Sequence, residues 1–177
     1  MNTAKKVLDI AVSVAILVVC AMICWSYATH KSISFDGATA GQVTGGESNR
    51  LRGVSLPSLT GYQWSGHRET LLLAVRSGCH YCQDSRTFYA RLKQMESSGE
   101  LNAHLLAVLP DDKDSGTAFL RSGNAEIEAV FDQPLNNIQV LGTPTILLVD
   151  SHGTVVREWV GRLSRDAEEA VIKAARG

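Results

Sequence analysis

Residues 70–92, TLLLAVRSGCHYCQDSRTFYARL, decide the fold of this chain. The apolar run 70–75 is typical of a buried strand, and residues 83–92 are typical of a helix. Cys79 and Cys82 stand between these two elements as a Cys-x-x-Cys pair. The sequence therefore predicts a strand that delivers two cysteines to the start of a helix, where the helix dipole stabilises a thiolate.

A Cys-x-x-Cys pair occurs in zinc sites, in structural disulfides and in dithiol–disulfide redox centres. Structural zinc needs four ligands, and the only other cysteines are Cys20 and Cys24, in an apolar segment. A disulfide that closes so short a loop gains little loop entropy. A redox centre is the favoured interpretation. The alternatives are a copper-handling module and a non-catalytic peptide-binding domain whose disulfide is structural.

The two cysteines are not expected to be equivalent. Cys79 lies at the mouth of the predicted helix, where cysteine pKa values are roughly 3.5 to 7.5, and it is the expected nucleophile. Cys82 lies one turn deeper and is the expected resolving thiol, buried inside the domain. His80 and Tyr81 are candidates for tuning the pair, since a protonated His80 would favour the thiolate. This chemistry needs no metal and no cofactor.

The N-terminal region predicts a membrane anchor. Residues 1–6 carry two lysines and are the expected cytoplasmic stub, and residues 7–28 are mostly apolar, with Asp9 as their only charged residue. Such a stretch suits a helix that crosses about 30 Å of hydrocarbon, with the lysines inside and the rest of the chain outside the cytoplasmic membrane. A cleaved signal peptide is the alternative, because residues 26–28 resemble a cleavage site.

Residues 29–50 are polar and glycine-rich, and they predict a flexible linker. Residues 51–177 alternate between strand and helix patterns, which predicts an α/β domain with a mixed central sheet flanked by helices. The expected strands are 70–76, 103–109, 127–131, 145–149 and 154–159, with a short one at 62–64. The expected helices are 79–95, 115–121 and a last one capped by Ser164. The net charge of −1 gives no basic field for a nucleic acid partner.

A second motif, Gly142-Thr143-Pro144-Thr145, directly precedes an expected strand. Together with the Cys-x-x-Cys unit, the hairpin around Gly153 and the later Gly161, it resembles the thioredoxin-like superfamily. Within it, the chain is most similar to membrane-anchored, exported thiol–disulfide oxidoreductases, including those that serve cytochrome c maturation. The resemblance covers residues 56–175 and implies a thioredoxin-like fold preceded by one transmembrane helix.

The resemblance also implies roles for single residues. Pro144 is expected to be cis and to face the sulfurs, and the backbone of Thr143-Pro144 is expected to receive the substrate chain as an added strand. The implied partners are protein disulfides or dithiols and a membrane-bound or exported electron-transfer protein, with this chain as the reductant. One departure matters: the buried acid of cytoplasmic thioredoxin falls at Leu73, which leaves proton transfer at Cys82 without an assigned group.

Overall fold

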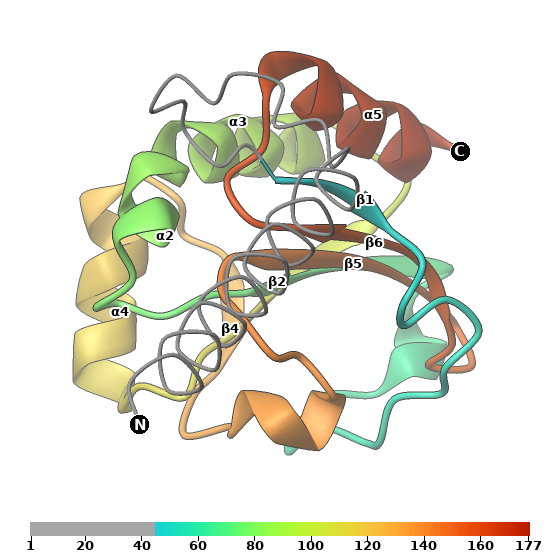
Figure 1. Ribbon diagram of the computed structural model, residues 1–177, viewed down its shortest axis with the longest axis horizontal. Helices are drawn as coiled ribbons and strands as arrows, with labels where there is room; N and C mark the ends of the chain where they lie inside the picture. The colour runs from blue at the N-terminus through green and yellow to red at the C-terminus, as the bar shows by residue number, and fades with distance from the viewer. Residues whose placement is uncertain (1–44) are drawn as a thin grey trace, which may run out of the picture. The chain divides into compact units, whose positions relative to one another are not determined.

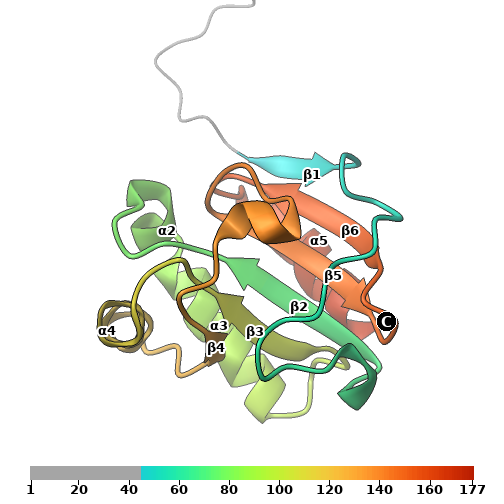
Figure 2. The same ribbon diagram turned by 90° about the horizontal axis from the view of Figure 1, so that it is seen from below.

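The computed structural model describes residues 45–177, which form a six-stranded sheet in the order β1-β6-β5-β2-β3-β4 (Figure 2). The pairs β2–β3 and β3–β4 are parallel, and the other pairs are antiparallel, so the sheet is mixed as expected. The strands are β1 (Gly46–Ser48), β2 (Glu69–Ala74), β3 (His104–Val108), β4 (Glu128–Val130), β5 (Thr145–Asp150) and β6 (Val155–Val160).

Helices cover one face of this sheet, and loops with short 3-10 turns cover the other (Figures 1 and 2). The helices α3 and α5 pack on the first face, and α4 adds Phe119 and Leu120 to the same core. The turn η2 and residues from Leu51 to Trp64 pack on the second face. The helical elements are α2 (His80–Asp84), α3 (Arg86–Ser97), α4 (Lys113–Ser122), α5 (Arg165–Arg176), η1 (Trp64–Gly66) and η2 (Leu135–Ile138).

The central strand β2 divides the core into two clusters. Successive side chains of a strand point to opposite faces, so Leu71 and Leu73 enter the cluster under α3 and α5. Leu72 and Ala74 enter the cluster under η2. Because the strand is buried on both faces, its sequence is a continuous apolar run rather than an alternating one.

Three local predictions differ from the structure. The predicted helix 79–95 is interrupted at Ser85, whose hydroxyl donates a hydrogen bond to the Tyr81 carbonyl at 2.8 Å and separates α2 from α3. The predicted strand at 62–64 is replaced by a single bridge at Tyr62 followed by η1. The strand β1 lies within the predicted linker 29–50, so ordered structure begins before residue 51.

The predicted stub at 1–6, the predicted anchor at 7–28 and most of the linker lie outside the described residues. Within residues 45–177, no helix combines the length and the apolar character that crossing a membrane requires.

Glu158 on β6 is a buried carboxylate that holds the first segment of the domain against the sheet. It is fully buried and accepts hydrogen bonds from the Leu51 backbone N–H at 3.1 Å and from Arg50 Nη2 at 3.3 Å. The same guanidinium nitrogen donates to the Gln139 carbonyl at 2.8 Å, just before the segment that leads to Pro144. A buried charge needs such partners, because an unpaired one is strongly destabilising.

We expect Glu158→Gln to lower the free energy of unfolding by about 1–3 kcal/mol, because the charge-assisted hydrogen bonds to Arg50 and Leu51 are weakened. Urea denaturation measures this change. Glu47→Gln is the matched control: its carboxylate is half-exposed and lies 3.9 Å from Arg157, so we expect a loss below about 0.5 kcal/mol. Equal losses in the two variants would contradict a clamp at Glu158.

Candidate active site

The pairing of β2 with β5 brings the two sequence motifs together. These strands are antiparallel, and Ala74 at the end of β2 lies opposite Thr145 at the start of β5. The chain that leaves β2 therefore meets the chain that enters β5. Cys79 and Thr143, which are far apart in sequence, come into contact at this edge of the sheet.

The sulfur of Cys79 takes part in two hydrogen bonds. Cys79 is the N-cap of α2, and its sulfur accepts a hydrogen bond from the Cys82 backbone N–H at 3.2 Å. As a thiol, it also donates to the Thr143 carbonyl at 3.3 Å. The Thr143–Pro144 peptide bond is cis, and the Pro144 carbonyl accepts a hydrogen bond from the Gly161 backbone at 2.8 Å. Cys82 and Thr143 thus both contact the Cys79 sulfur, and Pro144 directly follows Thr143.

A contact that the sequence analysis missed orders the loop before Cys79. The Ser77 backbone N–H donates to Asp111 Oδ2 at 3.1 Å, and the Ser77 hydroxyl donates to Asp111 Oδ1. Gln83 closes the loop from the other side by donating from its side chain to the Ser77 carbonyl at 3.1 Å. Asp111 follows β3, which is parallel to β2, so the two strands end at the same edge. No local sequence signal pairs two residues so far apart.

Cys82 has a different environment from Cys79. Its side chain is fully buried, whereas Cys79 is half-buried, and both are free thiols. Burial raises the pKa of Cys82 to about 12, with the neighbouring Cys79 adding to the rise. The backbone at Arg76 and the Thr143 side chain act in the opposite direction. The Cys82 thiol is therefore protonated at neutral pH in this environment.

His80 and Tyr81 both face solvent at the mouth of α2. The His80 side chain is 79% exposed and its Nε2 lies 3.6 Å from Asp84 Oδ2. Asp84 also meets Arg162, at 3.5 Å. The Tyr81 ring lies beside that of His80, with centroids 5.7 Å apart. The imidazole is therefore placed next to a carboxylate one turn along α2.

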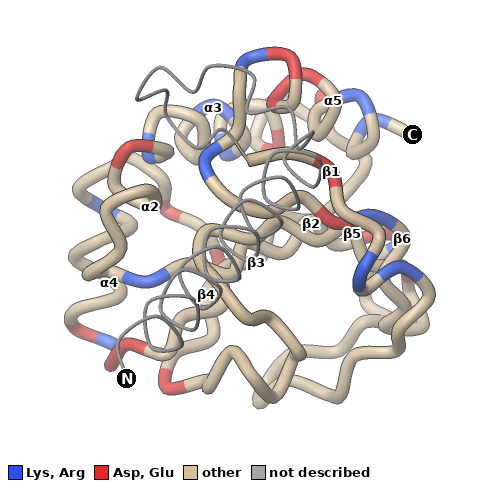
Figure 3. The backbone as a smooth tube through the Cα atoms, viewed as in Figure 1, with Lys and Arg blue, Asp and Glu red and all other residues tan. Residues whose placement is uncertain are grey.

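Exposed apolar side chains surround the two motifs. In the described part of the chain, the exposed large apolar residues are Tyr81, Leu141 and Val160. Tyr81 follows Cys79, Leu141 precedes Thr143, and Val160 pairs with Thr145. Figure 3 shows acidic and basic residues interspersed among the described elements. The three exposed apolar side chains therefore distinguish this edge of the sheet from the rest of the described surface.

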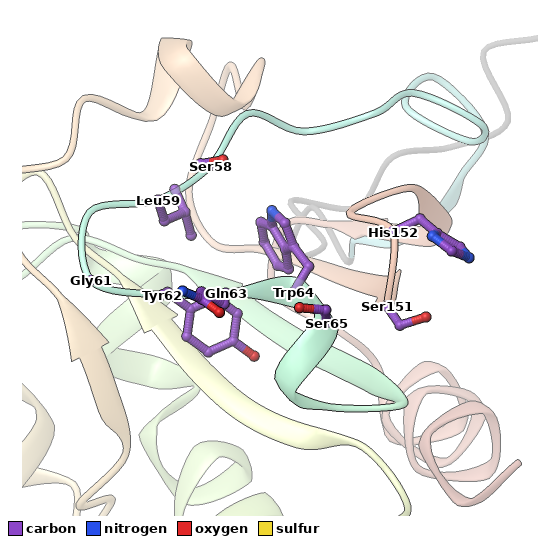
Figure 4. A pocket seen from close by; sticks show the side chains of 9 residues that line it. All are labelled: Ser58, Leu59, Gly61, Tyr62, Gln63, Trp64, Ser65, Ser151 and His152. Carbon is purple, nitrogen blue, oxygen red and sulfur yellow. The ribbon is translucent and has the colours of Figure 1, made fainter.

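Two surface pockets lie at opposite ends of the sheet. The first, of about 480 Å³, borders the Cys79 edge and is lined in part by Arg76, Leu141 and Thr143. The second lies before the start of β2, and Figure 4 shows Trp64 there between the segment at Ser58 and the turn at His152. The six residues of β2 separate the two ends by about 20 Å. The second pocket is therefore not part of the thiol site.

A metal-binding interpretation needs further ligands beside the cysteine pair. Within residues 45–177, no three side chains of His, Cys, Asp or Glu are grouped as metal ligands. His80 is the nearest candidate in sequence, and its ring faces Asp84.

The family model of the thioredoxin-like domain matches residues 59–176, which is about two thirds of the chain. The chain belongs to the thioredoxin-like family. With its Cys-x-x-Cys pair at the start of a helix, it is a thioredoxin-like thiol–disulfide oxidoreductase. No curated protein matches the chain in sequence.

Solved structures extend the comparison. A thiol:disulfide interchange protein DsbE from Chlorobium tepidum is similar, with 25% identity, a TM-score of 0.53 and coverage of 77% of this chain and 100% of that chain. The thioredoxin domain of a Bacteroides vulgatus thiol-disulfide oxidoreductase has 19% identity and a TM-score of 0.50, covering 63% and 81%. A secreted Mycobacterium tuberculosis disulfide oxidoreductase has 13% identity and a TM-score of 0.50, covering 65% and 85%. The last two show similarity of fold alone.

We expect iodoacetamide to label Cys79 much faster than Cys82 in the reduced protein at pH 7. Cys82 is buried, and its raised pKa keeps the thiol protonated, whereas alkylation needs an accessible thiolate. Peptide mapping by mass spectrometry gives the labelled fraction at each cysteine. In guanidinium chloride the two rates should converge, and rapid labelling of Cys82 in the folded protein would contradict the assigned asymmetry.

Proposed function

We propose that this chain reduces protein disulfides, with Cys79 as the nucleophile and Cys82 as the resolving thiol. The observation that carries this proposal is the asymmetry of the two sulfurs. Cys79 is partly accessible and accepts a backbone N–H hydrogen bond at the start of α2. Cys82 is fully buried directly behind it. A helix N-terminus stabilises the charge of an attacking thiolate.

The proposed reaction has two exchanges. The Cys79 thiolate attacks a substrate disulfide, forms a mixed disulfide and releases the first substrate sulfur as a thiolate. Cys82 then loses its proton and attacks Cys79, so that the Cys79–Cys82 disulfide forms and the second substrate sulfur leaves. Each released sulfur takes up a proton from water. The substrate gains two electrons, and the enzyme dithiol is oxidised.

The edge around Cys79 suits an extended polypeptide substrate. The backbone at Thr143 lies beside the Cys79 sulfur, and main-chain pairing there would place a substrate strand along the same edge. Such pairing tolerates varied sequences because it uses main-chain groups. The exposed side chains of Tyr81, Leu141 and Val160 would then contact apolar residues on either side of the substrate cysteine.

The setting of this activity is also part of the proposal. The apolar segment 7–28 would act as a single-pass anchor, with the part of the predicted linker 29–50 that precedes Gly45 as a tether and the catalytic domain outside the cytoplasmic membrane. A membrane-bound or exported electron-transfer partner would then reduce the Cys79–Cys82 disulfide. His80 would tune the reduction potential from its position beside Asp84.

We expect Cys82→Ser to accumulate a disulfide-linked substrate protein, because the mixed disulfide at Cys79 can no longer be resolved. Cys79→Ser should accumulate none, since the remaining sulfur is buried. Non-reducing electrophoresis of cells that express each variant detects the adduct. Equal trapping by the two variants would be incompatible with the assigned roles.

The reduction potential of the Cys79–Cys82 couple tests the direction of electron flow. A reductant requires a potential near that of thioredoxin, about −270 mV, and a value near about −120 mV would instead identify an oxidant. Equilibration with glutathione buffers of known ratio, followed by alkylation and mass spectrometry, gives this value. We expect the lower range.

A further inference from the structure

The pocket of about 480 Å³ beside the Cys79 edge has a single charged residue, Arg76, among the residues that line it. Arg76 is exposed, and none of the ion pairs formed within residues 45–177 includes its guanidinium. Arg162, which also lies near the two motifs, is by contrast paired with Asp84 at 3.5 Å. The Arg76 guanidinium is therefore available to an anion that enters the pocket from outside the described domain.

The remaining walls of this pocket are mostly apolar. Two prolines line it together with Leu135, Val140 and Leu141, and none of its lining residues is an acid. Leu141 is 81% exposed. The nearest acid in sequence, Asp111, directs both carboxylate oxygens at Ser77. A glutamate side chain suits such a surface, because its methylene groups can contact the apolar walls while its carboxylate binds the guanidinium.

Two residues that line the pocket also contact Cys79. The Arg76 carbonyl accepts a hydrogen bond from the Cys79 backbone N–H at 3.1 Å. The Thr143 carbonyl lies 3.3 Å from the Cys79 sulfur. An extended polypeptide advances about 3.3 Å per residue. If its cysteine meets Cys79 and its backbone pairs at Thr143, side chains within about three positions of that cysteine can therefore reach the pocket.

We propose that this pocket is a substrate subsite that binds a glutamate side chain close to the cysteine that Cys79 attacks, and that Arg76 binds its carboxylate. This inference rests on the proposed attack of Cys79 on protein disulfides and adds a class of substrate, namely disulfides with an acidic residue nearby in the sequence. Main-chain pairing at Thr143 accepts varied sequences, so the charge of Arg76 supplies a selectivity that the backbone lacks. The subsite changes how tightly the substrate is held before exchange and leaves the exchange itself unaltered.

The test uses the full chain with Cys20→Ser, Cys24→Ser and Cys82→Ser, so that Cys79 is the one remaining thiol. The substrates are peptides with one cysteine, joined through a disulfide to thionitrobenzoate, which is the better leaving group. A glutamate, glutamine or lysine stands at each of the positions within about three residues of the cysteine in turn. Stopped-flow absorbance of released thionitrobenzoate gives the rate constant, and mass spectrometry identifies the peptide on Cys79.

We expect the glutamate peptide to react about fivefold faster than the lysine peptide in about 0.1 M NaCl at one or more positions, with the glutamine peptide between them. The ratio should approach one in about 1 M NaCl, where charges are screened within about 3 Å. Arg76→Gln should bring the ratio below about twofold, and Arg76→Lys should keep most of it. Because both peptides meet the same thiol, the ratio cancels any effect of Arg76 on the reactivity of Cys79 itself.

Arg68→Gln is the matched control. Arg68 is also exposed and directly precedes β2, so the six residues of this strand separate it from Arg76 by about 20 Å. The substitution removes the same charge, but at about 0.1 M salt that distance exceeds the screening length of about 10 Å. We therefore expect Arg68→Gln to leave the ratio unchanged.

The outcomes separate the subsite from the proposed function. Equal rates for all peptides, or faster reaction of the lysine peptides, with the peptide still attached to Cys79, would overturn the subsite and leave the role of Cys79 standing. A ratio that survives Arg76→Gln, or that Arg68→Gln lowers equally, would overturn the assignment to Arg76. Undiminished release from Cys79→Ser with Cys82 restored would overturn the proposed nucleophile and the inference with it.

Discussion

The reactive edge depends on the central position of β2, which pairs with β3 in parallel and with β5 in antiparallel orientation. Parallel pairing makes β2 and β3 end at the same edge, so Asp111 reaches the loop that carries Ser77. Antiparallel pairing makes β5 begin at that edge, so Thr143 reaches Cys79. One buried apolar strand therefore brings three separate segments of the chain to a single sulfur.

The same strand separates the ionisable groups of the interior. Its alternating side chains define two core clusters, with Cys82 in one and Leu51, whose N–H binds Glu158, in the other. A carboxylate beside Cys82 could accept the proton of the thiol. Its negative charge would also disfavour the thiolate. The buried carboxylate is engaged by Arg50 and Leu51. Burial and the neighbouring Cys79 raise the pKa of Cys82, and hydrogen bonds at the Arg76 backbone and the Thr143 side chain lower it. The raised pKa keeps the Cys82 thiol protonated at neutral pH.

Local signals made much of the fold predictable from the sequence. The apolar run of β2, the hairpin of β5 and β6 and the Ser164 cap of α5 all occur where their patterns place them. The exceptions depend on contacts that no local pattern encodes. Ser85 interrupts a helix through a side-chain bond to the Tyr81 carbonyl. The polar, glycine-containing β1 becomes a strand because β6 offers it a free edge.

The residues of the site could be predicted from the sequence where they lie within a short motif. Spacing identified Cys79 and Cys82, and resemblance identified Thr143 and Pro144, because each lies in a short contiguous segment. The bond between Ser77 and Asp111 was not predictable, because the two residues lie 34 positions apart in the sequence. They meet only because β2 and β3 pair in parallel and end at the same edge of the sheet. A contact of this kind depends on strand pairing between distant segments, so it can be recognised only in the folded structure.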